Sequence, residues 1–176
     1  KTQERMALGI QKAKNDIIAQ TDAGCIVKED WLEKITKPFT DSKTQLVAGF
    51  YEMVTKTAFQ RALAPFLGIT QSRFDPRVFM PSARSMAFRK KLWEEVGGYS
   101  EKLQRAGEDT LFNYLVVKKG VDIDRVKDAL VYWEVPKTLK EASNKFFWYS
   151  YGDAQAKIYW HPSQRLATHN VKITML

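Results

Sequence analysis

The chain has 176 residues, of which 44% are hydrophobic and 27% are charged, and 28 Lys and Arg against 20 Asp and Glu give it a formal net charge of +8. This composition excludes a disordered or collagen-like chain, and a folded chain of this size buries about 70% of the surface that it exposes when unfolded. The single cysteine, Cys25, excludes an internal disulfide framework and a cysteine-rich zinc module. Its apolar runs are far shorter than the ~20 residues that span a bilayer as a helix.

Helical and strand-like patterns alternate along the chain, which predicts an α/β fold. In the first half, we expect a helix at residues 3–14, a strand at 17–19, a helix at 29–38, a strand at 46–53, a helix at 58–67 and a loop at 68–81. In the second half, we expect a strand at residues 84–89, helices at 90–96 and 108–119, strands at 121–126 and 129–134, and a helix within 138–159.

Two acidic segments lie where a predicted element ends or begins. Asp22 follows the first predicted strand, and open α/β sheets bind ligands beyond the carboxyl ends of their strands. A carboxylate there can hold a divalent cation that bridges phosphate oxygens. Glu108 and Asp109 begin a helix directly after Gly107, which allows a sharp turn. Taken singly, each segment is also typical of a turn or of helix capping.

The order and spacing of several segments give a more specific signal. They are Gly9-Ile10-Gln11-Lys12-Ala13, Asp16-Ile17-Ile18, Thr21-Asp22-Ala23-Gly24-Cys25, Asp30-Trp31-Leu32, Val47-Ala48-Gly49, Arg84-Ser85-Met86-Ala87-Phe88-Arg89, Trp93-Glu94-Glu95-Val96-Gly97-Gly98-Tyr99 and Gly107-Glu108-Asp109-Thr110. Over residues 3–156 the chain resembles the family 2 glycosyltransferases of GT-A fold. The resemblance implies a GT-A-like (Rossmann-like) mixed sheet flanked by helices, with a partial glycosyltransferase domain at residues 1–160 and a C-terminal tail at residues 161–176.

The resemblance also implies a role for each matching residue. Asp22 matches the first acid of the family's Asp-x-Asp element, which would engage a nucleotide-diphosphate sugar and a divalent metal, Mg²⁺ or Mn²⁺. Asp109 matches the catalytic base, which would take a proton from an acceptor hydroxyl as that oxygen attacks the anomeric carbon with inversion. The other implied residues are Glu108 beside the base, Ala23, Gly24 and Arg84 for the donor, and Arg89, Trp93 and Gly107 for the acceptor.

The chain departs from the family pattern in three respects. Position 24 is Gly, so the usual second carboxylate for the metal is absent. The family's first strand and its acidic loops, which hold the nucleobase and ribose, would lie before Lys1, so we expect a fragment. The Gln-x-x-Arg-Trp element of processive synthases is missing, which favours a single transfer to a glycan or lipid-linked hydroxyl. The alternative function is a non-catalytic carbohydrate- or partner-binding remnant of the same fold.

The segment at residues 138–159 is rich in aromatic residues with Lys among them. They could cover the sheet and line the acceptor pocket, lie on an anionic membrane surface, or stack on nucleic-acid bases. The resemblance implies envelope polysaccharide synthesis in the cytoplasm, at the inner face of the membrane, so a membrane contact is kept as an expectation and nucleic acid is not. We interpret Cys25 as a small buried thiol, and His161 and His169 lack metal-ligand spacing.

Overall fold

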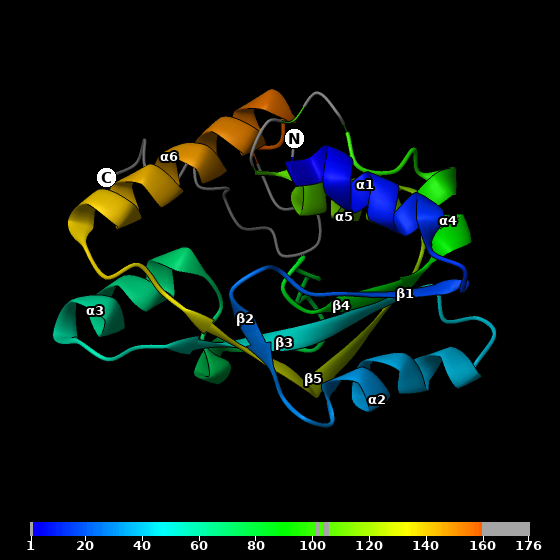
Figure 1. Ribbon diagram of the computed structural model, residues 1–176, viewed down its shortest axis with the longest axis horizontal. Helices are drawn as coiled ribbons and strands as arrows, with labels where there is room; N and C mark the ends of the chain where they lie inside the picture. The colour runs from blue at the N-terminus through cyan, green and yellow to red at the C-terminus, as the bar shows by residue number, and fades with distance from the viewer. Residues whose placement is uncertain (1, 101–102, 104–105, 160–176) are drawn as a thin grey trace.

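The computed structural model describes residues 2–100, 103 and 106–159, and its strands form one five-stranded mixed sheet in the order β1-β4-β3-β5-β2 (Figure 1). The strands are β1 (Ile17–Gln20), β2 (Cys25–Val27), β3 (Leu46–Val54), β4 (Met86–Arg89) and β5 (Ile123–Glu134). The helices are α1 (Thr2–Lys12), α2 (Trp31–Thr36), α3 (Ala58–Leu67), α4 (Lys90–Glu95), α5 (Glu108–Lys118) and α6 (Leu139–Gln155), with 3-10 turns η1 (Lys37–Thr40) and η2 (Gln71–Arg73). The predicted tail at residues 161–176, with His161 and His169, lies outside the described residues.

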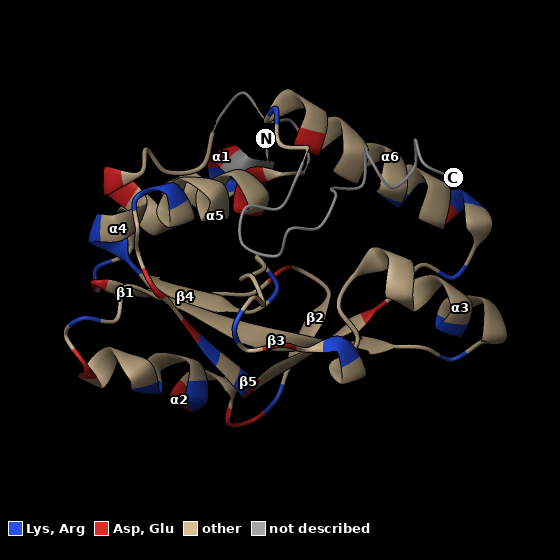
Figure 2. Cartoon of the chain, turned by 180° about the vertical axis from the view of Figure 1, so that it is seen from behind, with Lys and Arg blue, Asp and Glu red and all other residues tan. Residues whose placement is uncertain are grey.

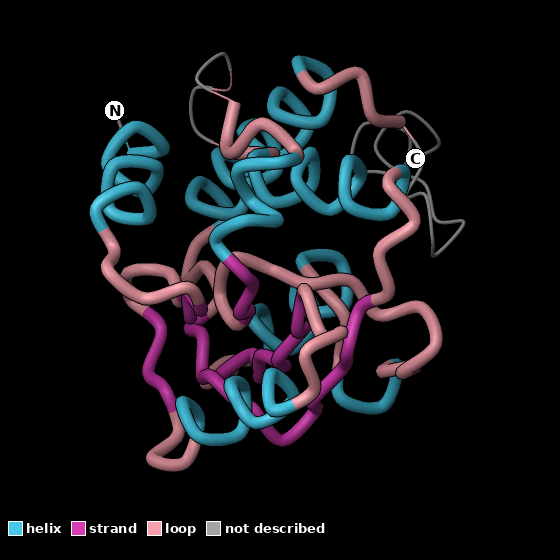
Figure 3. The backbone as a smooth tube through the Cα atoms, turned by 90° about the vertical axis from the view of Figure 1, so that its right-hand side faces the viewer, coloured by secondary structure: helices cyan, strands magenta, loops and turns pink. Residues whose placement is uncertain are grey.

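Helices cover both faces of the sheet, as the expected α/β fold requires. The helix α2 lies on one face, while α1, α4, α5 and α6 lie over the other (Figures 1 and 3). The central strand β3 is therefore enclosed, and its first six residues, from Leu46 to Tyr51, are all buried. A strand covered on both faces reads as a continuous apolar run, which is why its sequence predicts it correctly.

The strand directions bring three carboxyl ends to one edge of the sheet. β1 and β3 both run antiparallel to β4, and β3 runs parallel to β5. The ends of β1, β3 and β5 therefore meet at the same edge, and β2 returns from that edge along β5, with Cys25 opposite Trp133. The sequence analysis did not predict β2, because three residues after a glycine turn are too few to show a strand pattern.

β5 is one strand, whereas the sequence predicts two strands separated by Lys127 and Asp128. The register against β3 shifts between Gly49 and Phe50, which is the signature of a β-bulge. The two exposed, charged residues lie in this bulge and interrupt the apolar pattern without ending the strand.

A buried serine fixes this irregular region. Ser85 Oγ accepts a hydrogen bond from Trp31 Nε1 and donates one to the Ala129 carbonyl, each over 2.9 Å. Gly49 lies against the Ser85 hydroxyl and the Ala129 carbonyl, and a Cβ on Gly49 would be 2.7 Å from the Ala129 oxygen. The bulge therefore links α2, β3, β5 and the segment before β4.

Candidate functional site

The carboxylates of Asp22 and Asp109 lie at the sheet edge where β1 ends. Asp22 follows β1 by two residues, and Asp109 occupies the first turn of α5. Burial raises the pKa of Asp22; the nearby Arg84 and Lys145 lower it, and the nearby Asp109 carboxylate raises it. The two acidic segments, distant in sequence, thus lie within electrostatic reach of each other.

Backbone groups orient the Asp109 carboxylate. The Ala83 N–H donates to Oδ2 over 3.1 Å, and the Thr110 N–H donates to Oδ1 over 2.8 Å. Glu108 precedes it in the same helical turn. Because both oxygens accept backbone hydrogen bonds, the carboxylate has a defined direction relative to the sheet edge.

Two glycines allow the start of α5 to approach α6. Gly107 is the N-cap residue of α5 and has a φ of 91°, in the left-handed region that favours glycine. Its α-carbon faces Gly152 of α6, so that a Cβ on Gly107 would lie 3.0 Å from the Gly152 carbonyl carbon. The sharp turn expected at Gly107 is present, and it brings α6 alongside the helix that carries Asp109.

Arg84 lies between the carboxylates and a layer of aromatic rings. Its guanidinium donates to Ser82 Oγ over 2.9 Å and to the Tyr149 hydroxyl, and it lies 4.1 Å from the centroid of the Trp133 ring. Burial acts to lower the pKa of Arg84, but Tyr149 and other neighbours, including the Asp22 carboxylate, raise it above its ordinary value. Arg84 is therefore a fixed cation beside Asp22.

Lys145 of α6 is a second cation at this edge. Its Nζ lies 4.5 Å from the centroid of the Trp133 ring and 5.6 Å from that of Tyr149. Burial and the neighbouring Arg84 lower the pKa of Lys145 to about 8, against the opposing effect of Asp22. The site thus contains two carboxylates and two cations.

The aromatic segment of α6 divides between the site and the surface. Tyr149 lies against Arg84, and burial raises the pKa of its hydroxyl to about 12. Phe147 and Tyr151 remain exposed, with rings stacked at 6.0 Å. Tyr149 therefore packs inward against Arg84, whereas Phe147 and Tyr151 face the surface. A role of the segment in the acceptor pocket stays a prediction.

Other predicted site residues differ in position. Ala23 and Gly24 form the exposed turn after Asp22. Arg89 lies at the far end of β4, where it forms an ion pair with Asp16 over 3.1 Å. Trp93 is buried in the core, 6.0 Å from the Tyr99 ring centroid. Arg89 is therefore away from the carboxylates, and Trp93 packs on Tyr99. The acceptor roles of both residues stay predictions.

Tyr99 is a site neighbour that the sequence analysis missed. Its hydroxyl donates to Gln20 Oε1 over 2.7 Å. Burial raises the pKa of Tyr99 well above its ordinary value, and the Asp109 carboxylate adds to this effect. Trp133 was missed in the same way. Lys145 and Tyr149 belong to the aromatic segment for which lining a pocket was one alternative, and their four-residue spacing places them on one face of a helix.

The carboxylates present fit a divalent cation only if the donor phosphates supply most of its ligands. Position 24 carries no carboxylate, and the described part of the chain has no group of three His, Cys, Asp or Glu side chains that could hold a metal. Mg²⁺, however, is often bound through one or two carboxylates together with substrate phosphates. Asp22 fits that mode, in which the donor supplies the remaining oxygen ligands.

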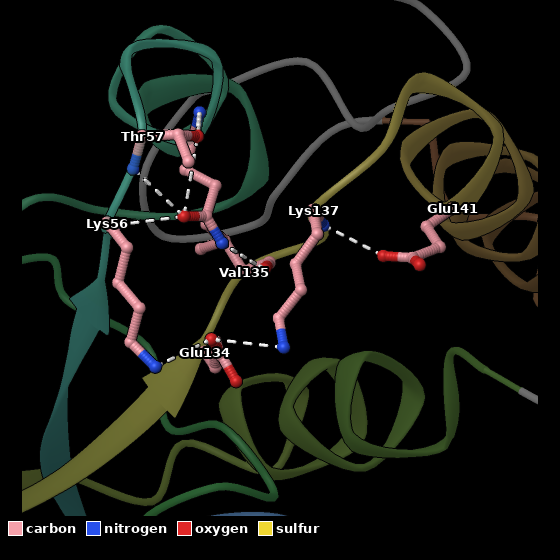
Figure 4. A network of polar contacts seen from close by, with 7 residues as sticks. Lys56, Thr57, Glu134, Val135, Lys137 and Glu141 are labelled. Carbon is pink, nitrogen blue, oxygen red and sulfur yellow. Dashed lines mark hydrogen bonds and ion pairs between the residues drawn. The ribbon is translucent and has the colours of Figure 1, made fainter.

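A cavity of about 430 Å³ opens beside Lys145, where β5 ends and α6 begins. Its lining residues are Glu134, Val135, Pro136, Lys137, Glu141, Asn144 and Lys145. Figure 4 shows the contacts at this junction, where Glu134 pairs with Lys56 over 3.1 Å and with Lys137 over 3.5 Å. The backbone N–H of Lys137 donates to Glu141 over 2.8 Å. Lys137 is thus engaged in the junction, whereas Lys145 borders both the cavity and the site.

Charged residues of both signs are interspersed over the sheet and the helices (Figure 2). The positive charge at the site therefore comes from Arg84 and Lys145 rather than from a uniformly basic face.

Among the helices that the structure describes, none has the length and apolar character needed to cross a membrane. Cys25 is a half-buried free thiol beside Asp22, and burial raises its pKa.

Comparison with known proteins gives this arrangement a family. The model of glycosyl transferase family 21 matches residues 4–145, whereas no curated protein matches the chain. The fold is similar to the mannosyltransferase PcManGT from Pyrobaculum calidifontis in complex with GDP-Man and Mn²⁺, with a TM-score of 0.56 and 18% identity over 99% of this chain and 44% of that one. It is also similar to GalNAc-T7 with UDP, GalNAc and Mn²⁺, with a TM-score of 0.54 and 16% identity over 87% of this chain and 37% of that one.

The chain spans less than half of the length of both solved structures. Their similarity confirms the GT-A-like fold that the sequence motifs imply. The sequence resemblance pointed to family 2, and the matching family model is that of family 21. The match covers most of the chain, and we conclude that the chain belongs to glycosyl transferase family 21.

Proposed function

We propose that the chain carries the base and the diphosphate side of an inverting glycosyltransferase, with a nucleotide-diphosphate sugar as donor and Asp109 as general base. The observation that carries this proposal is the convergence of Asp22 and Asp109 at the carboxyl edge of the sheet. This edge is where open α/β sheets bind their ligands. Family membership and the donor complexes of the two similar structures support a sugar-transfer reaction.

In the proposed reaction, the acceptor hydroxyl gives its proton to an Asp109 oxygen while its own oxygen bonds to the anomeric carbon. The bond from that carbon to the donor diphosphate breaks on the opposite face, so the configuration inverts. The backbone hydrogen bonds from Ala83 and Thr110 hold the base in a fixed direction. Arg84 lies where it can stabilise charge on the departing diphosphate.

A divalent cation, when bound, would neutralise part of the charge on the diphosphate. Asp22 is the residue that would hold it. Ala23 and Gly24 form the turn next to this carboxylate, and Glu108, in the first turn of α5, would help to position the acceptor or the metal.

The acceptor in this proposal is a glycan or a lipid-linked hydroxyl, and the product is a polysaccharide of the cell envelope. We place the reaction on the cytoplasmic side, at the inner face of the membrane. The exposed rings of Phe147 and Tyr151 on α6 support contact with a membrane surface.

The test is Asp109→Asn in the protein as it exists, assayed with UDP- and GDP-sugars. A general base contributes about 10²–10⁴-fold to rate, so we expect a loss of transfer of this size with donor binding largely intact. Asp128→Asn, which removes an exposed carboxylate in the β5 bulge, is the matched control and should leave transfer unchanged. Transfer that survives Asp109→Asn within a few-fold would show that the base is assigned wrongly.

A second candidate is a non-catalytic carbohydrate- or partner-binding remnant of the same fold. It is favoured by Gly24, which leaves the Asp-x-Asp element with one carboxylate. Calorimetric titration with nucleotide-sugars, with and without Mn²⁺, separates the two candidates. Donor binding together with transfer excludes the remnant, whereas glycan binding without either supports it.

A further inference from the structure

Lys145 has an unusual environment for a lysine. The side chain is half-buried, and its ammonium lies against the rings of Trp133 and Tyr149. Within the part of the chain that the structure describes, it forms neither an ion pair nor a hydrogen bond. An ammonium has three hydrogen-bond donors, so the donors of Lys145 remain available to a ligand.

The charges around Lys145 are those of the candidate donor site. Arg84, Asp22 and Cys25 all lie within electrostatic reach of its ammonium. Arg84 already donates to Ser82 and Tyr149 and stacks on Trp133. Of the two cations, Lys145 is therefore the one that donates no hydrogen bond to the residues that the structure describes.

We propose that Lys145 binds the diphosphate of the nucleotide-sugar donor, beside Asp22 and Arg84. This inference rests on the proposed function and names a donor contact that the sequence motifs do not include. An ammonium is a compact charge that suits phosphate oxygens, and a hydrogen bond to a charged oxygen is stronger than contact with an aromatic face. Lys145 leaves the rings when the diphosphate enters and stabilises the charge that the leaving group develops.

The position of Lys145 also complements the missing carboxylate. With Gly24 in place of an acid, the protein offers a metal ion one carboxylate at this element. A cation supplied by α6 would add positive charge beside the diphosphate. The fixed guanidinium of Arg84 and the free ammonium of Lys145 together form a two-cation anion site.

The competing explanation is that Lys145 only packs on Trp133. The two explanations predict opposite effects on stability. Burying an ammonium that forms no ion pair with the described residues opposes folding, so its replacement by Met should preserve or raise the melting temperature if the residue serves a ligand. If Lys145 stabilises the fold through its rings, the same replacement should lower the melting temperature.

The experiment is a calorimetric titration of the full-length protein with UDP and GDP, and with UMP and GMP, in the presence of Mg²⁺. For Lys145→Met we expect UDP and GDP to bind roughly tenfold more weakly or worse, as the loss of a charge-assisted hydrogen bond implies. UMP and GMP should change by less than about twofold, the range of a distant surface charge. Lys145→Arg keeps the charge and should retain most of the affinity for both diphosphates.

The matched control is Lys137→Met. Lys137 lines the same cavity but is paired with Glu134, so its loss should change UDP and GDP binding by less than about twofold. Unchanged diphosphate binding by Lys145→Met overturns the inference, and so does an equal loss in Lys137→Met, which would place the anion in the cavity. A lowered melting temperature with unchanged binding assigns Lys145 to packing and also overturns it.

The outcome is distinguishable from failure of the proposed function. Asp109→Asn should abolish transfer and still bind UDP and GDP, so a wrong base leaves the Lys145 result intact. If the full-length wild-type protein binds none of the four nucleotides, both the donor site and the Lys145 contact are refuted together.

Discussion

Arg84 and Lys145 show how two cations at one site can differ in freedom. Arg84 is held by Ser82, Tyr149 and the Trp133 ring, which fix its planar guanidinium. Lys145 contacts the same indole without a directional bond. A planar, multiply bonded group suits a permanent structural charge, and a flexible ammonium suits a charge that moves to a ligand.

The pH dependence of stability should reveal the cost of burying Lys145. Burial lowers its pKa from 10.5 to about 8, so the unfolded chain binds more protons than the folded chain between these values. Stability contributed by this residue therefore rises with pH across that window. We expect Lys145→Met to melt above the wild type at pH 7, by a margin that shrinks towards pH 10.

Thermal melts at stepped pH values measure this margin. Lys140→Met, on the exposed side of α6, is the control for loss of one positive charge. A margin that grows with pH, or one that Lys140→Met reproduces, would contradict the interpretation.

At the scale of elements, the contact between α6 and the start of α5 positions the base. Gly152 in α6 faces Ala106 and Gly107, and a Cβ on Gly152 would lie 2.6 Å from the Ala106 carbonyl carbon. The two helices can approach closely because Gly107 and Gly152, which face each other at this contact, have no side chains. Asp109 and Lys145 are thus brought to one site from different helices.

The variant Gly152→Ala tests whether the close contact between α5 and α6 outweighs the higher helix propensity of alanine. Alanine favours a helix interior by about 0.5–1 kcal/mol over glycine, but the steric conflict with Ala106 should reverse the sign and cost about 1–3 kcal/mol. Gly9→Ala in α1, where a Cβ meets nothing within 4 Å, should be stabilising. Urea denaturation of both variants gives the comparison, and a stabilising Gly152→Ala would show that the helices can separate freely.

Local sequence patterns predict most elements because burial and periodicity agree there. β3 is enclosed and reads as an apolar run, and α3 begins with a capping box between Thr57 and Gln60. The failures occur where tertiary pairing overrides pattern. β2 exists only because Cys25–Val27 lies against β5, and the β5 bulge hides two charged residues inside a strand.

At the scale of the whole molecule, one hydrophobic core joins both faces of the sheet. Phe88 of β4 is fully buried and lies 5.4 Å, between ring centroids, from Phe112 of α5. Trp31 on the opposite face belongs to the same cluster. A single core of this kind favours cooperative unfolding.

We therefore expect far-UV circular dichroism and tryptophan fluorescence to report one coincident thermal transition. Circular dichroism follows the helices, while the buried indoles of Trp31, Trp93 and Trp133 report both layers and the site edge. Loss of fluorescence signal before loss of helix would show that the layers unfold separately.

Local sequence segments pointed to some residues of the candidate site but not to the contacts that tertiary packing makes around them. Asp22 and Asp109 follow recognisable segments, and the strand order explains why they converge. Arg84 was proposed from the sequence, and the structure places it beside Asp22. Its partners Tyr149 and Trp133 come from α6 and β5, and no local pattern links them to Arg84. Arg89 and Trp93 belong to matching segments; Arg89 forms an ion pair with Asp16 and Trp93 is buried in the core, and their acceptor roles stay predictions.

The parallel pairing of β3 with β5 has a consequence for synthesis of the protein on the ribosome. β3 is complete at Val54, but its neighbour on one side, β5, ends only at Glu134. A nascent chain must therefore carry an apolar, unpaired strand edge from Val54 until β5 is made, and such edges associate with other chains. Slower elongation after β4, or a chaperone that shields Leu46–Val54 until β5 emerges, would protect the yield of native protein.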